Sequence, residues 1–112
     1  MEHAFRDAFD HKEVKDVRIS LREASFYLGT LKTEIRIRLY LRPEDATTVY
    51  YEQSHFLKTP MQRQTRPPTD NFADSEEEAF AEAIAALTDT YELALMSGHR
   101  ADDDWLVPNS YF

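Results

Sequence analysis

The chain has 112 residues, which fits a single domain, and 42% of them are hydrophobic, too many for a wholly disordered chain. It contains no cysteine, so thiol catalysis, thiolate metal sites and disulfide bonds are excluded. The formal net charge is −8. No apolar run is long enough to cross a bilayer, and the first 20 residues are charged throughout, so we expect a cytoplasmic protein.

The charge is divided unevenly along the chain. Residues 1–68 carry 12 basic and 10 acidic side chains, a net charge of +2. Residues 69–112 carry one basic side chain, Arg100, and 11 acidic ones, a net charge of −10. Such a field attracts basic partners and repels phosphate. The alternative is that these acids only make a helix exterior and a tail soluble.

Apolar residues at helical spacing predict a short helix over residues 2–12. His3, Asp7 and His11 follow each other at intervals of four within it, so they would share one side of the helix. Histidine and carboxylate are suitable zinc or nickel ligands, but this spacing is common by chance. We therefore predict a solvated polar face and no metal site.

Alternating apolar residues from 17 to 41 predict two antiparallel strands. Gly29 and Thr30 lie between them and suit a two-residue hairpin turn. This turn would place Phe26 opposite Thr33.

The apolar alternation changes parity within the first of these strands, while the second keeps one parity throughout. A β-bulge in which Arg22 and Glu23 together face Arg36 absorbs the extra residue. The apolar positions on the two sides of this change are Val17, Ile19 and Leu21, then Ala24, Phe26 and Leu28.

Residues 42–45, with a proline and two acids, carry the chemistry of a tight turn. A third strand is expected over about residues 47–57, in a register that places Val49 beside Leu39. Residues 59–74 contain three prolines and no sustained period, which indicates a long connector.

Ser75 and Glu78 form a capping box, so a helix should begin after Ser75 and run to about Ser97. Gly98 suits the left-handed position that ends it. The apolar stripe of this helix is predicted to be Phe80, Ala83, Ile84, Leu87, Tyr91, Ala94 and Leu95.

These elements predict an α+β fold of order α-β-β-β-α, in which a three-stranded antiparallel sheet packs on one long C-terminal helix. We expect a single domain over residues 1–100 and an acidic, aromatic C-terminal tail over residues 101–112.

The acidic segment suggests a small non-catalytic interaction or regulatory protein, of the inhibitor, immunity or adaptor type, that binds a basic protein surface. An exposed strand edge and the apolar tail also make a homodimer plausible. The alternative for the tail is docking on its own core. The expected partner-binding residues are Glu77, Asp102, Asp103, Asp104, Trp105, Tyr111 and Phe112.

Two other functions are weighed. The first is nucleic-acid binding by the outward face of the sheet. Glu23 and Glu52 speak against it, because they would neutralise much of the basic charge of that face. The second is a small-ligand binder or enzyme with a pocket between sheet and helix, where His55 is the candidate acid or base. No cofactor is predicted. The residues of the nucleic-acid alternative are Arg18, Arg22, Arg38, Tyr40 and Tyr50.

Overall fold

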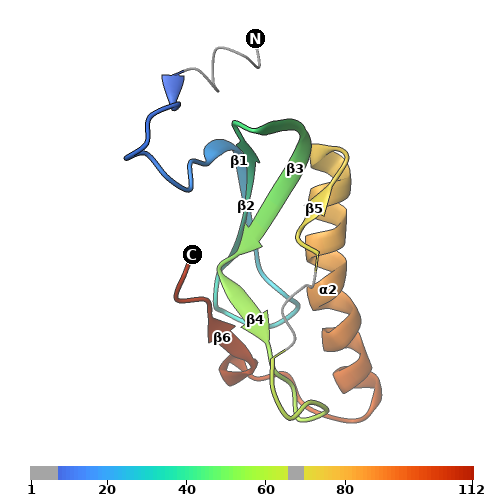
Figure 1. Cartoon of the computed structure of the whole chain (residues 1–112). Helices are drawn as coiled ribbons and strands as arrows, with labels where there is room; N and C mark the ends of the chain where they lie inside the picture. The colour runs from blue at the N-terminus through green and yellow to red at the C-terminus, as the bar shows by residue number, and fades with distance from the viewer. Residues whose placement is uncertain (1–7, 66–69) are drawn as a thin grey trace.

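A computed structural model describes residues 8–65 and 70–112. Its elements, shown in Figure 1, are the strands β1 to β6, the long helix α2 and the short 3₁₀ helix η1. In chain order they are β1 (Ile19–Phe26), β2 (Ile35–Arg42), β3 (Asp45–Gln53), β4 (His55–Leu57), β5 (Phe72–Ala73), α2 (Glu76–Met96), η1 (Asp103–Trp105) and β6 (Leu106–Pro108).

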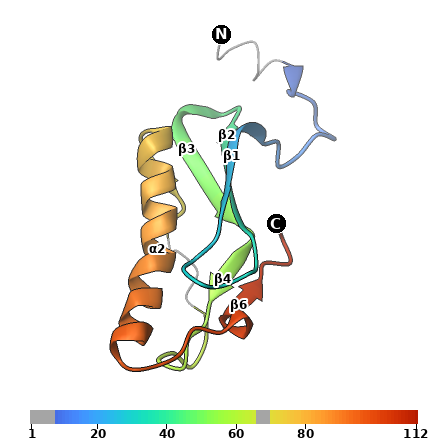
Figure 2. The same ribbon diagram turned by 180° about the vertical axis from the view of Figure 1, so that it is seen from behind.

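The predicted α+β fold with an antiparallel sheet and one long helix is confirmed, but the main sheet has four strands instead of three. Its order is β1-β2-β3-β5, and α2 covers one face (Figures 1 and 2). The added strand β5 comes from the connector, which sequence periodicity left without structure. The third predicted strand is split at Ser54, and its last part, β4, pairs with β6 of the tail.

The hairpin register differs from the prediction by two residues, because Phe26 pairs with Ile35 and not with Thr33. Gly29 and Thr30 do form a tight turn, but β1 and β2 have already separated at residues 27–34. The separation has a physical cause in contacts from distant elements. Leu28 and Leu31 turn inward to a core cluster, and Asp103 of the tail binds the main chain of Lys32 and Thr33.

The predicted β-bulge in the first strand is present, one position earlier than expected. The register shifts between Ser20 and Arg22, so Leu21 is the extra residue. The predicted bulge at Arg22 and Glu23 opposite Arg36 was therefore misplaced: Arg22 pairs with Leu39, and Glu23 pairs with Arg38 because the hairpin register is offset by two.

The turn between β2 and β3 lies at Pro43 and Glu44, as residues 42–45 predict. The β2–β3 register is again offset by two residues: Tyr51, not Val49, pairs with Leu39. An even offset keeps the same side chains on the same face, because side chains alternate with period two. Val49 and Tyr51 are accordingly both buried.

The helix α2 begins as predicted, with Ser75 as its N-cap accepting a hydrogen bond at 3.1 Å from the main-chain N–H of Glu78. Gly98 follows its end with φ of 91°. Leu95, predicted for the buried stripe, is exposed, whereas Ala79 is buried. The centre of the predicted apolar stripe is therefore rotated slightly from the centre of the buried face of α2. The buried residues of α2 are Ala79, Ala83, Leu87, Tyr91 and Ala94.

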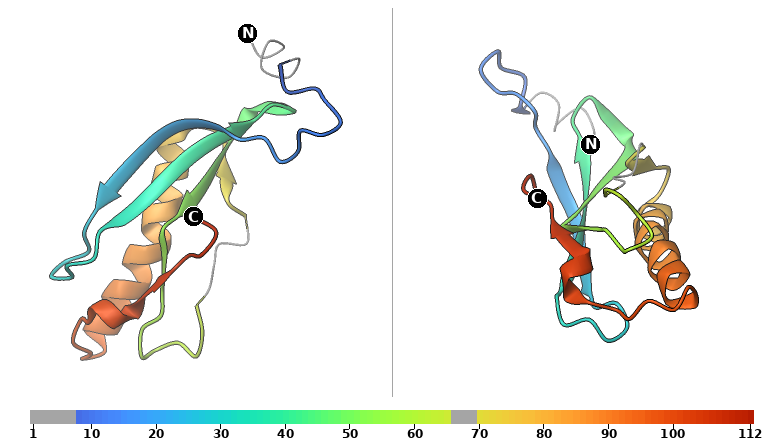
Figure 3. Two further views of the ribbon diagram at one scale, coloured as in Figure 1. Left: turned by 90° about the vertical axis from the view of Figure 1, so that its left-hand side faces the viewer. Right: turned by 90° about the horizontal axis from the view of Figure 1, so that it is seen from below.

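The predicted helix over residues 2–12 falls mostly on residues 1–7, outside the described part of the chain. Within the described part only Ala8 is helical, and the chain leaves the helix by Asp10. The segment that follows lies beyond one end of the sheet before it enters β1 (Figure 3). Two of its apolar side chains, Phe9 and Val14, are exposed. Phe9 and Val14 line a hollow with Arg42 and Pro43 but belong to neither core cluster. A short helix without core packing is only marginally stable, which explains why spacing alone does not extend the helix.

The tail contributes directly to the hydrophobic core. Trp105 and Leu106 pack in one cluster with Tyr91 of α2, and the rings of Tyr91 and Trp105 meet edge to face with centroids 6.1 Å apart. Gly29 has φ of 48°, and any side chain there would collide with the Tyr91 hydroxyl. This approach explains why glycine is needed in the turn.

No helix in the described part of the chain has both the length and the apolar character that crossing a membrane requires.

Candidate functional site

The exterior of α2 carries an acidic stripe, which we define as Glu78, Glu82, Asp89 and Glu92. At 100° per residue these positions fall within an arc of about 80°, on the side opposite the buried stripe. All four side chains are exposed. The last turn of the helix contains no basic residue that would offset them.

The acids of the stripe have no ion pair with lysine or arginine among the described residues. The α2 carboxylate that does have one is Glu76, whose Oε1 lies 2.7 Å from the Nε of Arg22 at the sheet edge. Glu77, one of the expected partner-binding residues, is exposed near the start of the helix. Within residues 8–65 and 70–112, the four acids of the stripe are therefore not neutralised by a lysine or arginine of the same chain.

The three consecutive aspartates of the tail have different surroundings. Asp103 accepts hydrogen bonds from the main-chain N–H of Lys32 and Thr33 and, at 2.6 Å, from the Thr33 hydroxyl. The Thr33 bond, with smaller help from the main chain and Lys32, lowers the pKa of Asp103 below its usual value. Asp102 caps η1 by accepting from the N–H of Asp104, so Asp102 and Asp103 both have structural partners.

The aromatic residues of the tail divide into inward and outward groups. Trp105 is 6% exposed in the core, so its indole ring is not presented to a partner. Tyr111 is 91% exposed. Phe112 lies against the guanidinium groups of Arg36 and Arg38, at 5.0 and 4.1 Å from its ring centroid. The main-chain oxygen of Phe112 also accepts a hydrogen bond from Arg38.

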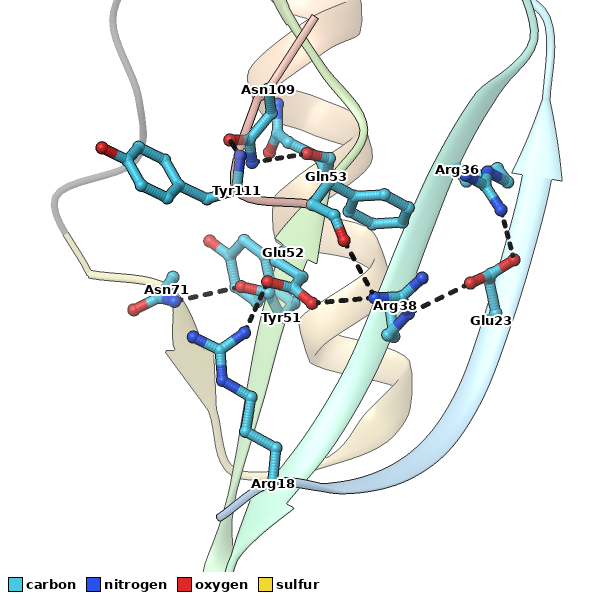
Figure 4. Close-up of polar contacts among 11 residues, drawn as sticks. Arg18, Glu23, Arg36, Arg38, Tyr51, Glu52, Gln53, Asn71, Asn109 and Tyr111 are labelled. Carbon is cyan, nitrogen blue, oxygen red and sulfur yellow. Dashed lines mark hydrogen bonds and ion pairs between the residues drawn. The ribbon is translucent and has the colours of Figure 1, made fainter. Parts of the chain in front are cut away.

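Ion pairs occupy the outer face of the sheet, opposite α2 (Figure 4). Arg38 contacts Glu23 and Glu52, each at 3.2 Å, and Arg18 contacts Glu52 at 2.7 Å. Arg36 lies 3.5 Å from Glu23. These arginines are therefore already engaged by carboxylates of the same chain.

The aromatic residues of the nucleic-acid alternative form a cross-strand ladder. The Tyr40 and Tyr50 rings stack with centroids 5.5 Å apart, and Phe72 of β5 continues the row. Tyr40 is only 2% exposed, because the guanidinium groups of Arg18 and Arg42 also lie over its ring. A buried ring cannot offer its face to a nucleic-acid base.

Arg22 stands apart from the other residues of that alternative. Arg22 lies in β1 and pairs with Leu39 of β2, a core residue facing α2. Its guanidinium group contacts Glu76 of the helix. Arg22 therefore lies on the opposite side of the sheet from Arg38. The five expected nucleic-acid residues do not form one surface.

Ser54 and His55 form a hydrogen-bonded pair, with Ser54 Oγ 2.8 Å from His55 Nδ1. Ser54 Oγ also accepts from the N–H of Arg36, and the Ser54 N–H donates to the Arg36 carbonyl. Burial, with a smaller effect of the Arg36 charge, lowers the pKa of His55. Ser54 is buried and tied to β2 at the break between β3 and β4, which indicates a structural role for the pair.

Residues 8–65 and 70–112 contain no group of three or more histidines, cysteines or acids placed to hold a metal ion. His3 and Asp7 lie outside these ranges. Comparisons with protein-family models, with curated proteins and with solved structures found no match.

Sequence reasoning missed two asparagines that close the outer edge of β3. Asn71 donates from its side chain to the Tyr51 carbonyl and accepts from the Tyr51 N–H at its own carbonyl. Asn109 donates from its side chain to the Gln53 carbonyl and from its main chain to the Ser54 carbonyl. Both lie in segments without periodicity, so no local pattern marks their partners.

Proposed function

We propose that the protein is a non-catalytic interaction module that binds a basic protein surface through the acidic stripe of α2. The observation that carries this proposal is the lack of internal ion pairs for Glu78, Glu82, Asp89 and Glu92 among the described residues. Four arginines on or beside the sheet, Arg18, Arg22, Arg36 and Arg38, are in contrast each paired with a carboxylate of the same chain. A carboxylate left free by its own chain is available to a lysine or arginine of another protein.

The stripe also indicates what the partner looks like. From Glu78 to Glu92 it extends about 21 Å along the helix axis, at 1.5 Å per residue. Leu93 and Met96, 53% and 84% exposed, follow directly at its C-terminal end. The matching surface therefore carries lysines or arginines over about this length, with an apolar patch at one end.

Of the expected partner-binding residues, Glu77 and Asp104 belong to this proposal, because their side chains are exposed and no hydrogen bond or ion pair of those side chains is found in the described part of the chain. Tyr111 is exposed as well, but it lies by Arg18 and Glu52 of the outer sheet face, away from α2. Trp105 and Asp103 do not belong to the proposal, because the first is buried and the second is bound to the β1–β2 connection.

Affinity capture with a charge-reversed variant tests the proposal. Glu82→Lys combined with Asp89→Lys reverses the centre of the stripe, and Glu13→Lys combined with Glu34→Lys makes the same charge change at exposed sites elsewhere. We expect a partner that binds the wild type and the control but not the stripe variant, and calorimetry with that purified partner should show affinity that falls with added salt. Equal binding by both variants, or binding indifferent to salt, refutes the proposal.

A further inference from the structure

A hollow of about 250 Å³ lies at the outer edge of β3, between that strand and the end of the tail. Six of its lining residues carry the argument, and none of them belongs to the acidic stripe. They are Arg18, Glu52, Gln53, Asn71, Asn109 and Tyr111. Figure 4 shows Tyr111 and Arg18 on opposite sides of this region, with Asn71 beside them.

The edge of β3 is closed against an added strand. Asn71 binds the main chain of Tyr51, and Asn109 binds the carbonyls of Gln53 and Ser54. Strand addition needs a row of free main-chain groups, which these two asparagines occupy. The hollow between them therefore suits a compact ligand and not an extended peptide.

The lining of the hollow has no net charge. Its charged members are Arg18 and Glu52, which are joined at 2.7 Å. A phosphate or carboxylate would have to compete with Glu52 for Arg18, and a cation would have to compete with Arg18 for Glu52. The ligand that fits best is neutral.

The remaining polar groups combine acceptors and donors. The Asn71 side chain uses its nitrogen for Tyr51, which leaves its oxygen as an acceptor. Arg18 has more N–H groups than the contact with Glu52 uses. Hydroxyl groups, which both donate and accept, match such a mixed set.

Tyr111 supplies an apolar surface on the rim. Its ring is 91% exposed, while its main-chain N–H is held by the Asn109 side chain at 3.0 Å. An aromatic ring held at its backbone provides contact area at a small cost in conformational entropy. The carbon–hydrogen face of a sugar ring can stack on it while the hydroxyl groups reach the polar lining.

From these contacts we infer that the hollow is a binding site for a neutral polyhydroxylated ring, such as one hexose unit of a carbohydrate. The juxtaposition that carries the inference is an exposed tyrosine beside a lining whose charges, Arg18 and Glu52, pair with each other and which includes the Asn71 side-chain oxygen. The site is independent of the proposed partner surface on α2.

Saturation-transfer NMR with D-glucose, D-galactose, D-mannose and N-acetyl-D-glucosamine tests the inference, with glucose 6-phosphate, adenosine and uridine as comparison ligands. We expect transfer to at least one neutral sugar and amide shifts at Asn71, Asn109 and Tyr111 in the labelled protein. Tyr111→Ala should weaken that binding about three- to tenfold, the value of one aromatic contact. Tyr111→Trp should restore it.

The matched control is Tyr27→Ala, which removes another exposed tyrosine, 58% exposed in the β1–β2 connection, and should leave sugar binding unchanged. The inference is overturned if none of the four sugars shows transfer, if Tyr111→Ala binds as tightly as the wild type, or if only the nucleosides or the phosphorylated sugar bind. Thermal unfolding of each variant verifies that it is folded.

Discussion

Replacing Trp105 with alanine tests whether the tail is part of the folded core. The indole ring is 6% exposed and touches Tyr91 of α2 edge to face. A buried tryptophan removes about 200 Å² from water, which at about 25 cal/mol per Å² corresponds to about 5 kcal/mol. Measured substitutions of this kind cost about 3–5 kcal/mol, because the cavity only partly closes. We expect a loss in that range, out of a total stability of about 5–15 kcal/mol for such a domain.

The assay is urea unfolding followed by far-ultraviolet circular dichroism, with Tyr111→Ala as the matched control. Tyr111 belongs to the same tail but is 91% exposed, so its replacement should change stability by about 0.5 kcal/mol or less. For a chain of this size the Trp105 variant should also melt about 12–20 °C lower. A loss below about 1 kcal/mol for Trp105→Ala, with an unchanged m-value, would refute docking of the tail on its own core and favour a partner-facing indole.

Three further predictions concern the residues that hold the tail and the strand break. Asp103→Ala should destabilise the protein at neutral pH. Because the folded-state pKa of Asp103 is lowered, the stability difference between variant and wild type should disappear as pH falls through that pKa. A stability difference that persists in strong acid contradicts this. Because burial lowers the pKa of His55, its NMR titration midpoint should lie below 6.5, and a midpoint at or above 6.5 contradicts this. The wild type should lose stability as pH falls below 6.5, and His55→Gln should lose less, because it has no imidazole to protonate. Phe112→Ala should cost about 0.5–1 kcal/mol in urea unfolding by removing its contacts with Arg36 and Arg38, and a cost above about 2 kcal/mol would indicate a larger packing role.

The elements that depend on local chemistry were predictable from the sequence. The start of α2 follows from the Ser75 cap, and the turn after β2 follows from Pro43 and its neighbours. The presence of a bulge in β1, though not its position, was predictable because a change of parity in the apolar alternation requires one extra residue. Each of these signals is contained within a few residues of the chain.

The register and the fourth strand depended on contacts across long distances in sequence. Asp103 holds the main chain at Thr33, 70 residues earlier, and thereby keeps β1 and β2 apart near the turn. The strand β5 forms only because Phe72 and Ala73 meet the edge of β3. Neither segment contains a sequence pattern that identifies its distant partner, so periodicity alone could not predict these pairings.

For the candidate sites, the sequence indicated the sign of the charge but not its distribution over the surface. The excess of acids in residues 69–112 was visible from counting, and α2 does display four of them as the acidic stripe. Counting could not show that Asp103 is used internally or that Tyr40 is covered by Arg18 and Arg42. Which polar groups remain for a ligand depends on pairings made in three dimensions.

The placement of Trp105 makes the protein its own optical reporter. It is the single tryptophan of the chain, and it lies at the junction of the tail, α2 and the β1–β2 connection. Its fluorescence emission should therefore be blue-shifted in the native state and should follow undocking of the tail. Should the emission change before the helix melts, the tail opens as a separate step; if both signals move together, the last residues unfold with the whole molecule.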